Sequence, residues 1–146
     1  MSLRGHSPLI GSEHVLKKLL WLGASPDRII TDVNESPKFG IVEIKCPYSK
    51  RDVTVSEACE DNSFYCSMID GNPKLKENSE YHYQVQGQMA LTGASWCDFV
   101  VMTKKSISIE RIRFNVAIWD VMCQIINNFY FSHYLKYAAT KSIANN

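Results

Sequence analysis

The segment from Phe39 to Cys46 constrains the fold more than any other part of the sequence. It reads FGIVEIKC and is followed by Pro47, a composition and a boundary typical of a β-strand. Because side chains alternate across a strand, Ile41, Glu43 and Lys45 share one face. The sequence therefore predicts a sheet in which a carboxylate and an ammonium group stand together beside apolar residues.

Hydrophobic spacing predicts helices and strands on both sides of this segment. We expect helices over Ser12–Leu22, Ser56–Ile69, Asn78–Thr92 and Asn115 to about Ala144, and further strands over Asp27–Val33, Phe99–Thr103 and Ser106–Phe114. The first two strands should pair antiparallel, and the last helix should pack on the sheet. This order predicts an α/β (α+β) fold with a mixed central β-sheet flanked by helices.

Composition narrows the classes of protein that fit. The 146 residues suit one domain, and 16 Lys and Arg against 15 Asp and Glu leave a net charge of +1, so any site for a polyanion must be a local patch. No apolar run is long enough to cross a bilayer, and the start lacks the apolar stretch of a signal peptide, so we expect a soluble, intracellular protein without a membrane partner. The five cysteines lack CxxC spacing, and the four histidines show no ligand spacing, which argues against a zinc site.

The charged strand predicts a magnesium site if its neighbour supplies a second carboxylate. Asp27 enters the paired strand, and correct register would bring it close to Glu43. Two carboxylates with waters and a substrate phosphate are typical surroundings of Mg²⁺, and the Ile44 main-chain carbonyl could add a third oxygen. Lys45 could position or deprotonate the attacking water. The alternative is a surface strand whose Glu and Lys face solvent.

Three sequence blocks in this order carry a resemblance to a known family. They are W-L-G-A-S-P-D at 21 to 27, E-I-K-C-P-Y-S-K-R-D at 43 to 52 and Y-H-Y-Q-V-Q-G-Q-M at 81 to 89. Together they resemble the PD-(D/E)XK nuclease superfamily, and within it the branch of lambda exonuclease and the YqaJ-type viral recombinases. The resemblance implies a restriction-endonuclease-like fold and hydrolysis of DNA phosphodiesters with Mg²⁺, or Mn²⁺ as a substitute. In this branch hydrolysis usually starts from 5′ ends of duplex DNA, in recombination or viral-type DNA processing.

The resemblance also implies roles for individual residues. Asp27 and Glu43 become metal ligands, Lys45 becomes the water-activating residue, and Gln84 becomes the active-site glutamine.

Two further glutamines follow Gln84 on the same predicted helix. Gln88 is one turn away, so both amides should point the same way. Gln86 and Gln88 remain candidates for packing or for DNA contact.

Lys50 and Arg51 follow the charged strand, and the resemblance places them close to the path of the DNA phosphates. Arginine suits forked phosphate contacts. A solvated loop is the alternative interpretation. Weaker candidates for the same basic track are Lys74, Lys76, Lys104 and Lys105. The resemblance makes duplex DNA ends the expected partner, and ring-shaped homo-oligomers are common in the branch.

The chain departs from the family pattern at its start. Family members usually carry a further acidic residue on an upstream helix, whereas Glu13 is the only acid among the 26 residues before Asp27. We therefore expect residues 1–146 to form a single nuclease-like domain with an absent or abbreviated N-terminal helical part. The leading hypothesis is a metal-dependent deoxyribonuclease, an exonuclease rather than an endonuclease. The alternative is a catalytically inactive nuclease fold that binds DNA or serves as a structural domain.

Overall fold

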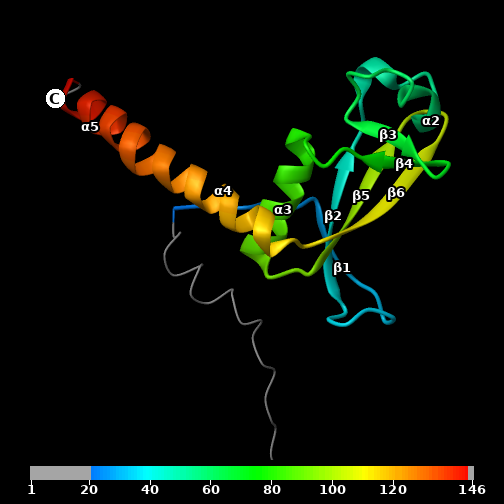
Figure 1. Ribbon diagram of the computed structural model, residues 1–146, viewed down its shortest axis with the longest axis horizontal. Helices are drawn as coiled ribbons and strands as arrows, with labels where there is room; N and C mark the ends of the chain where they lie inside the picture. Colours follow the sequence, from blue (N-terminus) through cyan, green and yellow to red (C-terminus); the bar gives the residue numbers. More distant parts are fainter. Residues whose placement is uncertain (1–20, 145–146) are drawn as a thin grey trace, which may run out of the picture. The chain divides into compact units, whose positions relative to one another are not determined.

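The computed structural model describes residues 21–144 (Figure 1). The predicted helix Ser12–Leu22 lies almost wholly outside this range. The chain divides between Phe114 and Asn115 into two compact units, and each is described by itself. The prediction that residues 1–146 form a single domain therefore stays a prediction.

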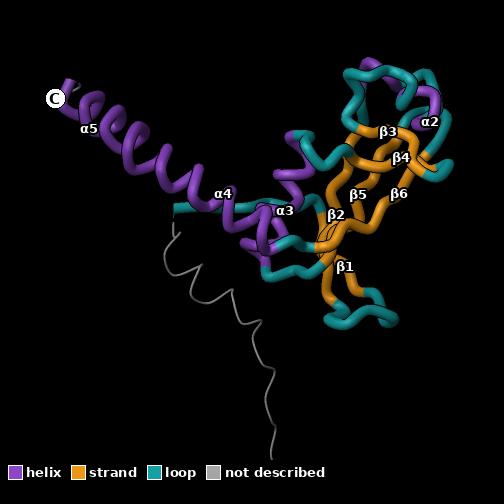
Figure 2. The backbone as a smooth tube through the Cα atoms, in the orientation of Figure 1, coloured by secondary structure: helices purple, strands orange, loops and turns teal. Residues whose placement is uncertain are grey.

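A mixed four-stranded sheet forms the centre of the first unit. Its strands are β1 (Arg28–Thr31), β2 (Phe39–Lys45), β5 (Trp96–Met102) and β6 (Ile107–Arg113), in the spatial order β1-β2-β5-β6 (Figure 2). The pairs β1–β2 and β5–β6 are antiparallel, whereas β2 and β5 are parallel. The expected mixed central sheet and the antiparallel first pair are confirmed.

Helix α3 (Glu80–Thr92) lies against β2 and β5. Ser79 begins it, because its hydroxyl accepts a hydrogen bond from the backbone N–H of His82, a standard N-terminal cap. Gly93, at φ 75°, ends it in the left-handed conformation, which glycine adopts without steric cost. Val85 and Met89 are fully buried in the core. The predicted helix over Asn78–Thr92 is confirmed.

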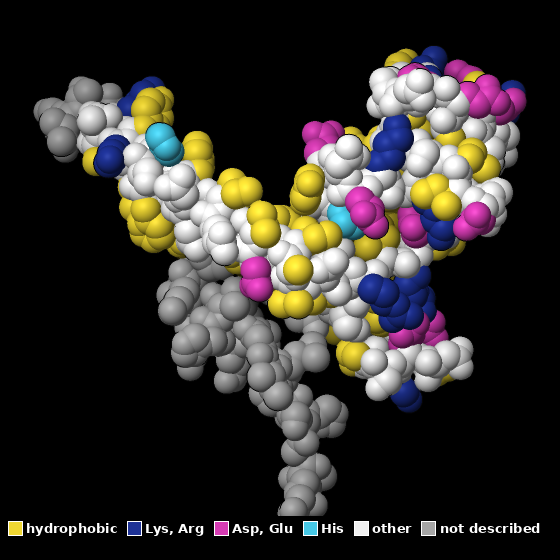
Figure 3. Space-filling model, in the orientation of Figure 1, with side chains coloured by type: hydrophobic (Ala, Val, Ile, Leu, Met, Phe, Trp, Pro, Cys, Tyr) yellow, Lys and Arg dark blue, Asp and Glu magenta, His cyan; other side chains and the backbone are white. Residues whose placement is uncertain are grey.

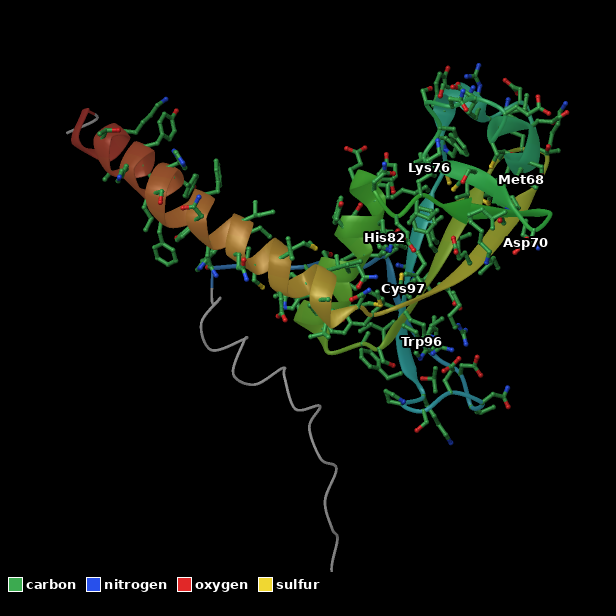
Figure 4. The ribbon with its side chains drawn as sticks, viewed as in Figure 1. Met68, Asp70, Lys76, His82, Trp96 and Cys97 are labelled. Atoms are coloured by element: carbon green, nitrogen blue, oxygen red, sulfur yellow. The ribbon has the colours of Figure 1, made fainter. Side chains whose placement is uncertain are left out.

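The segment between β2 and α3 corrects one expectation. The predicted helix Ser56–Ile69 is wrong: a short 3₁₀ helix (Tyr48–Lys50) is followed by α2 (Val55–Ala58) and by an antiparallel pair, β3 (Cys66–Ile69) and β4 (Asn72–Leu75). The turn between these strands is Asp70-Gly71, and both residues have positive φ, 49° and 76°. Two successive residues with positive φ are typical of a tight hairpin turn. This turn therefore favours a β-hairpin over the helix that the hydrophobic spacing predicts. Figure 4 labels Met68 and Asp70 on this hairpin.

The second unit is helical. It consists of α4 (Val116–Phe129), a π-helical turn (Tyr130–Tyr134) and α5 (Leu135–Ala144). The Asn115 side chain caps α4 by accepting hydrogen bonds from two backbone N–H groups. The predicted helix from Asn115 is confirmed, with a π turn inside it, while its packing on the sheet stays a prediction. No helix among residues 21–144 is long and apolar enough to span a bilayer.

All five cysteines are free thiols. Cys66 and Cys97 belong to the hydrophobic core, and burial raises the pKa of each to about 12, because an apolar environment disfavours the thiolate. Cys46, directly after β2, is exposed.

A charge network on the sheet face opposite α3 holds the loop between β1 and β2. The Arg111 guanidinium donates two hydrogen bonds to Asp98, each 2.8 Å, and Nη1 donates to Asp32 at 2.7 Å and to Glu35 at 3.0 Å. Arg113 donates two more to Glu35, at 2.6 and 2.7 Å. Figure 3 shows basic and acidic side chains gathered beside this loop. The network joins β5 and β6 to the loop that connects the first two strands.

Trp96 packs under this network and requires a glycine beside it. Its ring is fully buried, its indole N–H donates to the Pro37 carbonyl at 3.2 Å, and the Arg111 guanidinium lies 3.9 Å above it. A Cβ atom added at Gly40 would overlap the indole ring of Trp96. Figure 4 shows Trp96 and Cys97 at the start of β5.

We expect Gly40→Ala to lower the free energy of unfolding by about 1–3 kcal/mol, the usual cost of overpacking a core. Chemical denaturation measures this change. Gly23→Ala is the matched control, because a Cβ at Gly23 meets no atom of the described residues within 4 Å. Equal unfolding free energies for the two variants would contradict the close packing of Trp96 on Gly40.

The network also predicts a pH dependence. Hydrogen bonds from Arg113 and Arg111 lower the pKa of Glu35 to about 2 from its ordinary 4.5. A pKa that is lower in the folded state contributes stability above the ordinary pKa, and this contribution is lost as pH falls towards the folded value. Glu35→Gln should therefore lose less stability than wild type between pH 4.5 and 2, as measured by thermal unfolding. The exposed Glu60 gives the control Glu60→Gln, which should follow the wild-type curve.

Candidate active site

The end of β2 brings together the residues that the sequence singled out. Arg28 of β1 pairs with Val42, so the same register continued by one residue sets Asp27 opposite Glu43. A carboxylate oxygen of Asp27 accepts a hydrogen bond of 2.8 Å from the backbone N–H of Ile44. The structure thus places Asp27 against the backbone of the residue after Glu43, while the sharing of one cation by the two carboxylates stays a prediction.

Glu43 is a buried carboxylate, only 4% exposed, and such a group is costly unless it is paired and hydrogen-bonded. Its Oε1 accepts from Lys45 Nζ at 2.6 Å and from Gln84 Nε2 at 2.8 Å, while Oε2 accepts from Gln88 Nε2 at 2.9 Å. Strand alternation puts Glu43 and Lys45 on the face covered by α3. The surface-strand alternative is therefore wrong for Glu43.

Lys45 and Gln84 complete a closed ring of hydrogen bonds with Glu43. Lys45 Nζ also donates to Gln84 Oε1 at 3.1 Å, and it lies 4.5 Å from the centre of the Tyr81 ring. The Gln84 carbonyl therefore faces a cation and its NH₂ faces an anion, which fixes the orientation of the amide. Lys45 keeps 19% of its side chain exposed, so part of this side chain remains in contact with solvent.

The donor set fits a hard divalent cation. Asp27 and Glu43 offer carboxylate oxygens. In an extended strand, the N–H and C=O groups of one residue point the same way. The Ile44 carbonyl therefore points towards the same strand edge as the Ile44 N–H, which is the edge where Asp27 lies. Mg²⁺ prefers such oxygens and commonly retains several waters. Within residues 21–144, no group of three or more His, Cys, Asp and Glu side chains has the arrangement of a metal site, so any cation here would rely on two carboxylates and a backbone oxygen.

Comparison with known proteins gives a family. The YqaJ-like viral recombinase domain matches residues 10–95, more than half of the chain. The chain belongs to this family. The resemblance inferred from the three sequence blocks is thereby confirmed.

Two crystal structures of the alkaline exonuclease LHK-Exo from Laribacter hongkongensis are similar to this member of the YqaJ-like family. Each shares 22% sequence identity with it at a TM-score of 0.48, and one is a complex with dAMP. The matches cover 88% of this chain and 67% or 68% of the exonuclease. No curated protein matches the chain significantly.

The structure shows the contacts of Gln86 and Gln88, which the sequence left as candidates for packing or for DNA contact. Gln86 is 1% exposed and donates to the Arg113 carbonyl at 3.0 Å, and Gln88 is 5% exposed and donates to Glu43. Their burial removes both from the candidates for DNA contact. The signal for Gln88 was its spacing of four residues from Gln84, but its partner Glu43 lies 45 residues away in the sequence.

The basic loop after β2 is tied down by acidic neighbours. Lys50 Nζ forms an ion pair of 2.6 Å with Asp61 and holds the pKa of that carboxyl well below its usual range. The Arg51 guanidinium stacks 4.0 Å from the centre of the Tyr48 ring and pairs with Asp52 at 3.2 Å. Arg51 keeps 40% of its side chain exposed, against 26% for Lys50, which leaves it the more accessible of the two.

Proposed function

We propose that the chain is a magnesium-dependent deoxyribonuclease that hydrolyses phosphodiester bonds from the 5′ ends of duplex DNA. The observation that carries this proposal is the hydrogen-bonded ring of Glu43, Lys45 and Gln84 beside Asp27 at the end of β2. Family membership supports it, because the chain shares a domain with viral recombinases. The proposed biological setting is recombination or viral-type DNA processing.

In this proposal Asp27 and Glu43 hold the cation, with the Ile44 carbonyl as a third ligand. Mg²⁺, or Mn²⁺ in its place, supplies positive charge against the scissile phosphate and makes bound water more acidic. Each carboxylate, Asp27 directly before β1 and Glu43 in β2, contributes negative charge that favours binding of a divalent cation.

Lys45 acts beside these ligands. An ammonium group has three N–H donors, and two of them are held by Glu43 and Gln84. The third can donate to the attacking water or to a phosphate oxygen and so favour the charge that develops at phosphorus. Gln84 binds both the Lys45 ammonium group and the Glu43 carboxylate, and so fixes their positions relative to each other.

The test is release of nucleotides from 5′-phosphorylated duplex DNA with and without Mg²⁺. Glu43→Gln should abolish hydrolysis, because it removes a charged ligand. Lys45→Ala should reduce turnover by about 10² to 10⁴, the range typical of a proton-handling or positioning group. Its binding to duplex DNA in Ca²⁺ should be nearly unchanged, because one ammonium adds little to affinity shared among many phosphates.

Lys38→Ala is the matched control, since Lys38 is an exposed lysine in the β1–β2 loop and should leave turnover at the wild-type level. Wild-type turnover by Lys45→Ala would overturn the role of Lys45. DNA binding without any metal-dependent hydrolysis by the wild-type chain would favour the inactive DNA-binding domain. Nicking of closed circular DNA would identify an endonuclease.

A second prediction concerns the path of the DNA. Each phosphate contact adds about 0.9 to the slope of log affinity against log salt concentration. We expect Arg51→Ala to flatten that slope by about one contact, and the double change of Lys50 and Arg51 to Ala to flatten it further. Lys50→Ala alone should have the smaller effect, because Asp61 already pairs with Lys50.

The slope comes from fluorescence anisotropy of duplex DNA in Ca²⁺ over a range of salt concentrations. Lys136→Ala, an exposed lysine on α5, is the control and should keep the wild-type slope. An unchanged slope for the double variant would place Lys50 and Arg51 off the DNA path.

A further inference from the structure

Gln88 binds the oxygen of the Glu43 carboxylate that lies outside the hydrogen-bonded ring with Lys45 and Gln84. Lys45 and Gln84 both donate to Oε1, whereas Gln88 is the one donor to Oε2 within residues 21–144, at 2.9 Å. An ionised carboxylate has about four acceptor positions, two on each oxygen. Two donors therefore fill Oε1, and one acceptor position remains on Oε2.

The environment of Gln88 fixes the orientation of its amide. The side chain is 5% exposed, and a carboxylate oxygen accepts hydrogen bonds but does not donate them. The NH₂ group must therefore face Glu43, because the reversed amide would set two acceptors against each other. In that orientation, Gln88 Oε1 is buried and finds no hydrogen-bond donor among the described residues.

A buried amide with an unpaired oxygen is an unfavourable choice for packing alone. An apolar side chain of similar volume would fill the space without leaving a polar atom unpaired. Among residues 21–144, the hydrogen-bond partner of the Gln88 side chain is the Glu43 carboxylate, so the structure gives the amide a role at Glu43.

We propose that Gln88 is a positioning residue that holds Oε2 of Glu43 as the oxygen that takes the cation. This inference rests on the proposed metal site at Asp27 and Glu43. Groups that orient a metal ligand typically change metal affinity or activity by about 10- to 100-fold when they are removed.

The experiment is calorimetric titration of the whole chain with Mn²⁺ alone, without DNA. Gln88→Met keeps a similar volume and removes the N–H donor, and we expect Mn²⁺ to bind it about 10- to 100-fold more weakly than wild type. Its kcat for DNA hydrolysis in Mg²⁺ should fall while KM for DNA stays near the wild-type value. Thermal unfolding checks that the variant is folded.

Gln86→Met is the matched control. It makes the same change at a buried amide on the same helix, but Gln86 donates to the Arg113 carbonyl. It should lose thermal stability without losing Mn²⁺ affinity. If Gln88→Met fails to fold, Gln88→Asn keeps the amide but shortens it by one methylene, and should weaken Mn²⁺ binding in the same direction.

The outcomes separate this inference from the proposed function. Wild-type Mn²⁺ affinity in folded Gln88→Met, with DNA hydrolysis intact, overturns the role of Gln88 alone. An equal loss of Mn²⁺ affinity in Gln86→Met overturns it too, since the effect would then come from general loosening of α3. Weaker Mn²⁺ binding by Gln88→Met in a chain that never hydrolyses DNA supports the role of Gln88 and overturns the proposed function. Absence of Mn²⁺ binding by the wild-type chain overturns both.

Discussion

A carboxylate buried against a helix sets the geometry of the site. Glu43 lies beneath α3, where an unpaired charge would be very costly, and it is satisfied by Lys45 from its own strand and by Gln84 and Gln88 from the helix. Apolar contacts of Val85 and Met89 attract α3 to the sheet but carry little directional information. The hydrogen bonds to Glu43 supply this directional information. They can form only when α3 has one rotation about its axis and one position along it.

Contacts on the sheet face opposite the site help to position the second carboxylate, that of Asp27. Asp27 precedes β1 and Glu43 lies in β2, and both strands leave the loop that Arg111 holds through Asp32 and Glu35. Arg111 in turn pairs with Asp98 of β5, the strand that runs parallel to β2. Ion pairs on the sheet face opposite the site therefore connect the β1–β2 loop, and with it the two strands, to β5.

Local signals explain which parts of the fold were predictable. The strand pair and α3 follow from alternation, from Ser79 as a cap and from Gly93 as a terminator, all of which act over a few residues. The apolar spacing of Ser56–Ile69 suits a helix, which is why the sequence predicts one there. The Asp70-Gly71 turn instead selects a hairpin. At the site, Asp27, Glu43, Lys45 and Gln84 were predicted from the motifs, and the structure brings them together. The contact of Gln88 with Glu43 was not predictable, because it depends on tertiary packing between residues far apart in the chain.

The distribution of the five thiols has a practical chemical consequence. Burial raises the pKa of Cys59, Cys66, Cys97 and Cys123, and the thiolate is the form that reacts with alkylating reagents. Cys46 is exposed and directly follows Lys45. A maleimide fluorophore should therefore react faster at the exposed Cys46 than at the buried Cys66 and Cys97, which would place a label one residue from Lys45 without an engineered cysteine.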